Sequence, residues 1–169
     1  MLVKEAIETR RSIREFTNQA IDDAVLNEVL DAGRLAPSAS NRQRWKFIVV
    51  EDQGLKDALV PACANQSFIA KGQAIIVVCG DQGKTMRCGQ QINTIDCSIA
   101  LSFMMLQAWE LKLGMCWIGA FYEDQVRSVL GIPEDYEIVA LSPIGYPAKE
   151  MPSHNSLTLD EVIVKNHWK

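Results

Sequence analysis

The chain has 169 residues, 48% hydrophobic and 22% charged, which is about the amount of sequence that forms one domain. This composition excludes a disordered chain, a collagen and a disulfide-stabilised miniprotein. The 17 basic and 21 acidic residues give a formal net charge of −4, which argues against a nucleic-acid partner because such a protein needs a basic excess. We therefore expect a single domain over residues 1–169.

The first half of the chain predicts two helices, a polar loop, a strand and a helix. Apolar residues at helical spacing predict a short helix and then a longer one that starts near Asp22, where Asp22 or Asp23 can cap it. Pro37 ends this helical region, because the residue before a proline is pushed out of the helical conformation. The predicted segments, in order, are Val3 to Thr9, Asp22 to Pro37, the loop Pro37 to Gln43, the strand Trp45 to Glu51 and the helix Gln53 to Ala64.

The second half predicts a buried strand and a central helix. Ala74 to Cys79 is an apolar, β-branched run, which is typical of a strand buried on both faces. The segment from about Ile92 to Leu113 is apolar nearly all round, so this helix must be central, and Gly114 suits its C-cap. The remaining predicted elements are a short strand around Met115 to Ile118, a helix from Glu123 to Leu130 and a strand from Glu137 to Ile144. Helices and strands thus alternate around a small sheet.

The cysteines and the N-terminal residues indicate the cellular compartment in which the protein is expected. The chain has five cysteines, an odd number with no C-x-x-C pair, which indicates free thiols in a reducing cytoplasm. The N-terminal residues lack the apolar core of a signal peptide, and the apolar stretch around Ile99 to Trp109 is too short to span a bilayer. We expect a cytoplasmic protein with no membrane partner.

Three segments could bind a ligand. Arg10, Arg11, Ser12 and Arg14 combine three guanidinium groups with a hydroxyl, which can hold a phosphate; in an extended segment Arg10, Ser12 and Arg14 share one face. The alternative is a solvated basic turn that pairs with nearby glutamates. The other two segments are the loop Pro37-Ser38-Ala39-Ser40-Asn41-Arg42-Gln43, which offers close backbone approach and polar groups, and Cys116-Trp117-Ile118-Gly119-Ala120, whose last two residues leave backbone N–H groups uncovered. Each of these two could equally be an ordinary connection between elements.

Other kinds of site have little support. His154 and His167, the two histidines, lie in the tail, belong to no nucleophile motif and lack metal-ligand spacing with the cysteines. Asp96 lies in the apolar helix, where a paired structural carboxylate is expected rather than a catalytic base. No glycine-rich dinucleotide or phosphate-loop motif occurs. The sequence therefore predicts no metal site and shows no hydrolytic set of residues; cysteine–histidine catalysis stays open as an alternative, although no motif marks it.

Taken in order, the segments resemble the nitroreductase family of FMN-dependent oxidoreductases. The resemblance covers nearly the whole chain and rests on R-R-S-I-R-E-F, A-P-S-A-S-N-R-Q-R-W-K-F-I-V-V, W-I-G-A-F, and L-G-I-P-E-D-Y with G-Y-P. It implies an α+β fold with a small mixed central sheet flanked by helices. It also implies an intertwined homodimer with two FMN sites at the interface, each built from both subunits.

The resemblance assigns roles to individual residues. Arg10 and Ser12, helped by Arg11, would hold the phosphate, and Arg14 would lie near the N1/O2 edge of the flavin, where a cation favours hydride acceptance. The other subunit would contribute the loop. The full set of implied FMN-binding residues is Arg10, Arg11, Ser12, Arg14, Pro37, Ser38, Ala39, Ser40, Asn41, Gln43, Asn65, Trp117, Ile118, Gly119 and Ala120. Asn65 would contact the polar edge of the flavin, and Gly119 and Ala120 would offer N–H groups near N5.

The implied reaction is ping-pong. NAD(P)H transfers hydride to flavin N5 and leaves, and a small organic acceptor such as a nitroaromatic or a quinone takes its place. The sequence departs from the family pattern at Ser153-His154-Asn155-Ser156, where many members carry a phosphate-binding Lys or Arg, and at Phe68, where a family lysine lies beside the flavin. The alternatives are a non-catalytic FMN-binding or regulatory dimer, and a specialised family chemistry such as reductive dehalogenation.

Overall fold

A computed structural model describes residues 2–152 and 156–168 of the chain. It contains one four-stranded sheet with the strand order β1-β2-β4-β3, in which neighbouring strands run antiparallel. The strands are β1 Trp45–Val50, β2 Ala74–Asp81, β3 Gly114–Met115 and β4 Tyr136–Gly145. The α-helices are α1 Val3–Thr9, α2 Asp23–Arg34, α3 Gln53–Ala62, α4 Ile92–Glu110, α5 Glu123–Leu130 and α6 Leu159–Val162, and two short 3₁₀ helices are η1 Ala39–Asn41 and η2 Ser67–Lys71.

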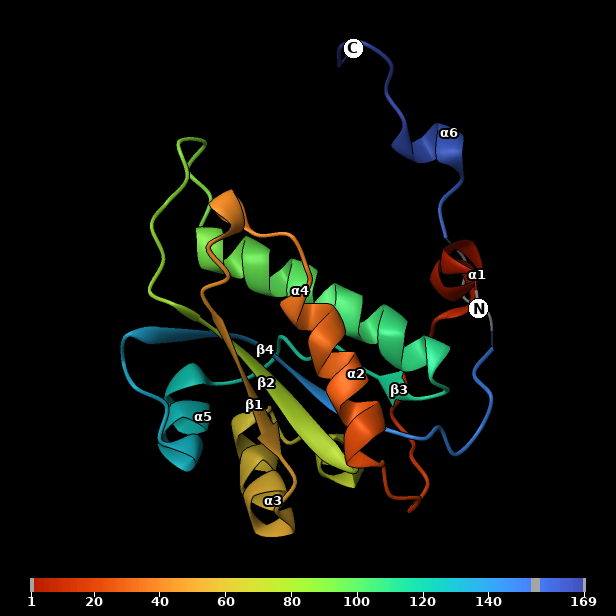
Figure 1. Ribbon diagram of the computed structural model, residues 1–169, viewed down its shortest axis with the longest axis vertical. Helices are drawn as coiled ribbons and strands as arrows, with labels where there is room; N and C mark the ends of the chain where they lie inside the picture. The colour runs from red at the N-terminus through yellow and green to blue at the C-terminus, as the bar shows by residue number, and fades with distance from the viewer. Residues whose placement is uncertain (1, 153–155, 169) are drawn as a thin grey trace.

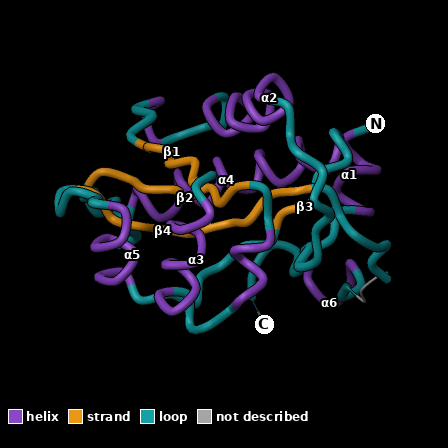
Figure 2. The backbone as a smooth tube through the Cα atoms, turned by 90° about the horizontal axis from the view of Figure 1, so that it is seen from below, coloured by secondary structure: helices purple, strands orange, loops and turns teal. Residues whose placement is uncertain are grey.

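The sheet is covered on both faces. Successive side chains of a strand point to opposite faces, so Ile76 and Val78 pack in the core beneath α2 and α4, while Ile75 and Val77 pack in the core beneath α3 and α5. Figure 2 shows the strands as a layer between α2 on one side and α3 and α5 on the other. This two-faced burial explains the unbroken apolar run of β2.

The long helix α4 crosses the whole molecule, as Figure 1 shows. Its buried residues, among them Ala100, Leu101 and Met104, pack against α2 and the sheet. Gly33 of α2 allows this close approach, because a Cβ there would lie 2.1 Å from the Cε atom of Met104. The expectation of a central helix is therefore confirmed.

The predicted α+β class is confirmed, and two details of the prediction change. The four strands pair antiparallel; within the described ranges the parallel part of the expected mixed sheet is the bridge between Ser12 and Met115. Gly114 is not the C-cap of α4: the helix ends at Glu110, Lys112 takes the left-handed conformation with φ 65°, and Gly114 begins β3. The reason is packing, since a Cβ at Gly114 would lie 2.3 Å from the Cγ1 atom of Ile13.

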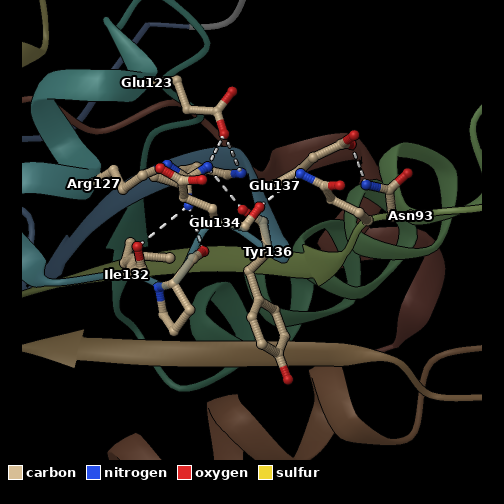
Figure 3. A network of polar contacts seen from close by, with 10 residues as sticks. Asn93, Glu123, Arg127, Ile132, Glu134, Tyr136 and Glu137 are labelled. Carbon is tan, nitrogen blue, oxygen red and sulfur yellow. Dashed lines mark hydrogen bonds and ion pairs between the residues drawn. The ribbon is translucent and has the colours of Figure 1, made fainter.

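Hydrogen bonds and an ion pair connect α5 to the start of β4 (Figure 3). Arg127 donates to the backbone carbonyls of Ile132, Pro133 and Tyr136 and pairs with Glu123. These bonds satisfy backbone carbonyls in the turn after α5 and at the start of β4; Gly131, directly after the helix, takes the left-handed conformation with φ 64°. Arg127 thus has a structural role, because its bonds hold α5 against the start of β4.

Apolar side chains remain exposed at both ends of the chain. Leu2, Val3 and Ile7 lie exposed on and before α1, and the tail adds Leu157, Leu159, Val162, Ile163, Val164 and Trp168. Figure 1 shows α6 and the C-terminus standing away from the three-layered body. None of the helices in the described part of the chain combines the length and apolar character needed to cross a membrane.

Candidate functional site

The arginine segment lies extended against the edge of the sheet. Ser12 forms a parallel bridge with Met115, and the N–H of Ile13 donates to the carbonyl of Met115 at 3.0 Å. Ile13 is buried, so its side chain points inward, and its neighbours in the extended segment project to the opposite side. The predicted period-two arrangement of Arg10, Ser12 and Arg14 therefore occurs.

Arg14, Ser12 and Arg10 act electrostatically on the thiol of Cys116, which follows β3. Burial raises the pKa of this thiol, while the positive charges of Arg14 and Arg10 and a hydrogen bond with Ser12 oppose that shift. Because burial is the largest effect, the pKa of the Cys116 thiol stays above its ordinary value, and the neutral thiol adds no negative charge beside these arginines. Nothing in the sequence distinguishes Cys116 from the other cysteines, because its proximity to Arg10 and Arg14 arises only in the fold.

The guanidinium group of Arg10 is suited to an anion. Its Nη1 atom is buried and has no hydrogen-bond partner among the residues that the structure describes. Arg11 differs, because its guanidinium donates to the carbonyls of Glu8, Arg10 and Pro152. A buried unpaired donor is costly, and a phosphate oxygen is a fitting acceptor for it.

Two of the three glutamates close to this segment, Glu8 and Glu15, pair with lysines, and no such pair is seen for Glu5 among the described residues. Glu8 pairs with Lys4, and Glu15 pairs with Lys149 at 2.6 Å. The alternative of a basic turn neutralised by its neighbouring glutamates is therefore not favoured for these two residues.

Arg14 is exposed, and its guanidinium group lies against an aromatic ring. Its guanidinium carbon lies over the ring of Phe68, 5.7 Å from the ring centroid. Phe68 lies in η2, at the position where the resemblance places a family lysine. The aromatic ring thus supports the cation of Arg14 instead of adding a second positive charge.

A turn after α3 approaches the segment that follows Cys116. Asn65 takes the left-handed conformation with φ 58°, and the side chain of Gln66 donates to the carbonyl of Cys63 at 3.0 Å and to that of Ala120 at 3.2 Å. The backbone of Ala120 is therefore held beside the turn that carries Asn65. The sequence analysis did not single out Gln66, and its only sequence signal was its position next to Asn65.

The residues from Trp117 to Ala120 divide into an inner and an outer part. Ile118 is buried, its N–H donates to Leu141 at 2.8 Å, and its side chain packs in the core beneath α3 and α5. Trp117 is half-buried against the opposite core, whereas Gly119 and Ala120 are exposed. A ligand can reach the backbone of the last two residues, while Ile118 supports them from inside.

The polar loop lies elsewhere in the molecule. Its residues Ala39–Asn41 form η1, and the N–H of Ala39 donates to the carboxylate of Asp96 in the N-terminal part of α4. The arginine segment lies at the other end of α4, where Trp109 donates to Thr9 at 2.9 Å. Figure 1 shows the loop and α1 at opposite ends of this helix.

This separation can be estimated from the helix itself. Asp96 and Trp109 both belong to α4, and thirteen residues of α-helix extend about 20 Å. Within one chain, contacts join Arg14 to Phe68 and Gln66 to Ala120, whereas the loop Pro37 to Gln43 lies at the other end of α4 from the arginine segment. The stretch Ser153-His154-Asn155, where the sequence departs from the family pattern, lies outside the described residues.

Comparisons with known proteins point to one family. The profile of the Nitroreductase family matches residues 7–91 and 64–146. A protein of Archaeoglobus fulgidus whose assigned name is NADH dehydrogenase/NAD(P)H nitroreductase is 35% identical over 148 residues, which cover 85% of this chain and 84% of that protein.

Solved structures agree in fold. A nitroreductase family protein from Clostridium novyi has a TM-score of 0.84 and 34% identity, over 92% of this chain and 89% of that one. The NADPH:FMN oxidoreductase of Vibrio harveyi, solved in complex with NAD⁺, has a TM-score of 0.91 and 25% identity, over 99% of this chain and 78% of that one.

Proposed function

The chain belongs to the nitroreductase family, and on that premise we propose that it works as a homodimer that passes hydride from NADH or NADPH to a small organic acceptor such as a nitroaromatic or a quinone. The chain is an NAD(P)H-dependent flavin oxidoreductase with FMN as its cofactor. When bound, FMN accepts the hydride from the nucleotide and gives it up to the acceptor. The identity of the acceptor, the order of the steps and the dimer are the proposed parts.

The observation that carries the proposal is the buried Nη1 atom of Arg10, which lacks a hydrogen-bond partner among the described residues. Together with Ser12 it would bind the FMN phosphate, and Arg11, already engaged with backbone carbonyls, would hold the segment in place. The neutral thiol of Cys116 beneath these groups leaves their positive charge available for the anion. The residues present therefore fit a phosphate-bearing cofactor.

The remaining residues would orient the ring system. Arg14, supported by Phe68, would place a positive charge at the N1/O2 edge, which favours hydride acceptance. Asn65 would bind the polar edge, and the exposed backbone N–H groups of Gly119 and Ala120 would donate near N5. No side chain is assigned the role of a general acid or base.

The loop would come from the second subunit. Pro37, Ser38, Ala39, Ser40, Asn41 and Gln43 lie at the far end of α4 from the arginine segment of their own chain. In a homodimer whose subunits exchange these ends, each loop would meet the arginine segment of the other copy. The five free cysteines support a reducing, cytoplasmic setting for such an enzyme.

We propose that the nucleotide and the acceptor use the same open site in turn, which is a ping-pong order. The test starts from the purified protein: its flavin spectrum is recorded under anaerobic conditions, NADH or NADPH is added, and a panel of nitroaromatics, quinones and a halogenated phenol follows. We expect bleaching by at least one nucleotide, reoxidation by an acceptor, and parallel lines in double-reciprocal plots.

Two outcomes would contradict this proposal in different ways. A colourless protein that gains no spectrum with added FMN would contradict the cofactor assignment. A protein that binds FMN but is reduced by neither nucleotide would favour the non-catalytic FMN-binding alternative. Reoxidation by the halogenated phenol alone would favour reductive dehalogenation.

A further inference from the structure

The loop that is proposed to meet the flavin has a strained backbone. Ser40, Asn41 and Gln43 take the left-handed conformation, with φ values of 53°, 54° and 52°. This region is disfavoured for residues that carry a Cβ, so it persists only where surrounding bonds fix it. The geometry of the loop must therefore be imposed by its contacts.

Bonds within the loop hold its internal shape. The N–H of Gln43 donates to the hydroxyl of Ser38 at 3.1 Å, and the side-chain amide of Gln43 donates to the side-chain oxygen of Asn41 at 3.1 Å. The N–H of Asn41 donates to the carbonyl of Ser38 at 2.9 Å. These bonds link loop residues to one another and do not fix the loop relative to the rest of the molecule.

Asp96 supplies the missing external contact. Both carboxylate oxygens lie 3.1 Å from the backbone nitrogen of Ala39, at the start of η1. Within the described part of the chain, this is the side chain outside the loop that bonds to the backbone of residues 38–41. A carboxylate that accepts from a backbone N–H forms a strong, charge-assisted bond.

The burial of Asp96 argues that this contact has a purpose beyond stability. Asp96 is 6% exposed and lies beside Cys97 and Ala100 among the mostly apolar buried residues of α4. A buried carboxylate loses its hydration, which is costly unless the hydrogen bonds that it accepts repay the loss. The position is therefore explained better by a need to hold the loop than by a need to stabilise α4.

We propose that Asp96 is a positioning residue for flavin binding: it fixes the loop 38–43 in the strained conformation that presents Ser38, Ser40 and Asn41 to the flavin site of the second subunit. This inference rests on the proposed function. Asp96 acts through the backbone of Ala39 and does not itself touch the flavin. Its replacement changes how tightly flavin binds without requiring a less stable fold.

The test compares three variants. Asp96→Leu removes the acceptor, Asp96→Asn keeps one oxygen that can accept, and Asn93→Leu is a control one turn earlier on α4, where a buried side chain bonds to Glu137 instead of the loop. For each holoprotein the dissociation constant of FMN is measured from the flavin fluorescence that appears on release. The thermal unfolding midpoint of the same samples freed of FMN is recorded as well.

We expect Asp96→Leu to weaken FMN binding roughly tenfold or more, with an unfolding midpoint that falls no further than that of Asn93→Leu. Asp96→Asn should recover part of the affinity, and Asn93→Leu should change it less than about twofold whatever its midpoint. Unchanged FMN binding in Asp96→Leu would overturn the proposal. So would an equal loss of affinity in Asn93→Leu, because it would indicate general weakening of the helix.

A fourth variant separates this inference from the site assignment. Asn41→Gly removes a loop side chain and leaves the left-handed backbone accessible, since glycine adopts it freely. If Asn41→Gly weakens FMN binding and Asp96→Leu does not, the loop binds flavin and the role of Asp96 is wrong. If neither variant changes FMN binding, the assignment of the loop to the flavin site is wrong.

Discussion

At the scale of single residues, Arg10 and Arg11 differ in whether their guanidinium groups already have hydrogen-bond partners. The Nη1 atom of Arg10 has no partner among the described residues, whereas Arg11 is bonded to three carbonyls. We therefore predict that Arg10→Ala weakens FMN binding by roughly tenfold to a hundredfold, because a hydrogen bond to a charged group contributes about 1.5–3 kcal/mol. Arg11→Ala, the matched control, should weaken it much less.

A comparison with riboflavin, which has the ring system of FMN but no phosphate, tests whether Arg10 acts on the phosphate. The dissociation constants of FMN and riboflavin are measured by fluorescence for the wild type and for both variants. Arg10→Ala should affect FMN and leave riboflavin nearly unchanged. An equal loss for the two ligands would show that Arg10 acts on the ring or on the fold instead of the phosphate.

The cysteines allow a second prediction at this scale. Burial raises the pKa of Cys63 and of Cys79 to about 11 and that of Cys97 to about 12, and it raises the pKa of Cys116. Cys88 is exposed. Since the thiolate is the reactive form, a disulfide reagent at pH 8 should titrate one thiol in the folded protein and all five in urea. Fast reaction of more than one thiol in the folded protein would contradict this.

The same thiols set the direction of the pH dependence. Their pKa values in the folded state lie above the ordinary value of 9.0, so the unfolded chain loses these protons first as the pH rises. Their contribution to stability is complete below about pH 9, and it is lost as the pH rises to about 11 for Cys63 and Cys79 and to about 12 for Cys97. The urea midpoint should accordingly fall across that interval.

At the scale of elements, the sequence predicted well what local signals determine. Val3–Thr9 and Glu123–Leu130 are helices with the expected bounds, and the unbroken apolar run of β2 gave its two-faced burial. The prediction was wrong for Gly114, because the side chain that fills the space above it, Ile13, is a hundred residues away in the chain. The left-handed backbone of the loop at Ser40 was also not predictable, since no glycine marks it.

The contact between Gly114 and Ile13 yields a prediction about the whole arginine segment. A Cβ at residue 114 would lie 2.3 Å from Cγ1 and 2.5 Å from Cβ of Ile13, so Gly114→Ala must displace the segment or β3. We expect a loss of about 1–3 kcal/mol in the free energy of unfolding, together with weaker FMN binding. Chemical denaturation and flavin fluorescence measure the two effects.

Gly131→Ala is the matched control. Gly131 has φ 64°, so alanine there is strained by about 1 kcal/mol, but no atom lies within 4 Å of the added Cβ. Stability should fall while FMN binding stays unchanged. If Gly114→Ala lowered stability and left FMN binding intact, the segment would not depend on this packing for its role.

At the scale of the whole molecule, the sequence indicated which residues belong to the site but not where they lie. The arginine segment and the loop were recognised from local composition, whereas their placement at opposite ends of α4 depends on how the helix is oriented in the fold. The exposed apolar residues of α1 and of the tail, such as Ile7 and Ile163, are a further whole-molecule feature. A second copy that covers them would also bring the two halves of each site together.

Complementation between two defective chains tests this directly. Arg10→Ala impairs the phosphate end and Asn41→Gly impairs the loop, so each homodimer has two impaired sites. A heterodimer of the two variants, isolated with two different affinity tags, should bind about one FMN per dimer with wild-type affinity. The reason is that one site receives both substitutions and the other receives neither.

A site formed within a single chain predicts a different number of FMN molecules bound per heterodimer. If the loop and the arginine segment of the same chain formed a site, each site of the heterodimer would carry one substitution, and wild-type affinity would not return. Titration of the heterodimer with FMN, beside mixtures of the two homodimers that have not exchanged subunits, separates these cases. Stoichiometric FMN on a species that sediments as a monomer would also contradict the two-subunit site. In a monomer the loop lies at the far end of α4 from Thr9, about 20 Å along the helix, so it cannot reach the arginine segment of its own chain.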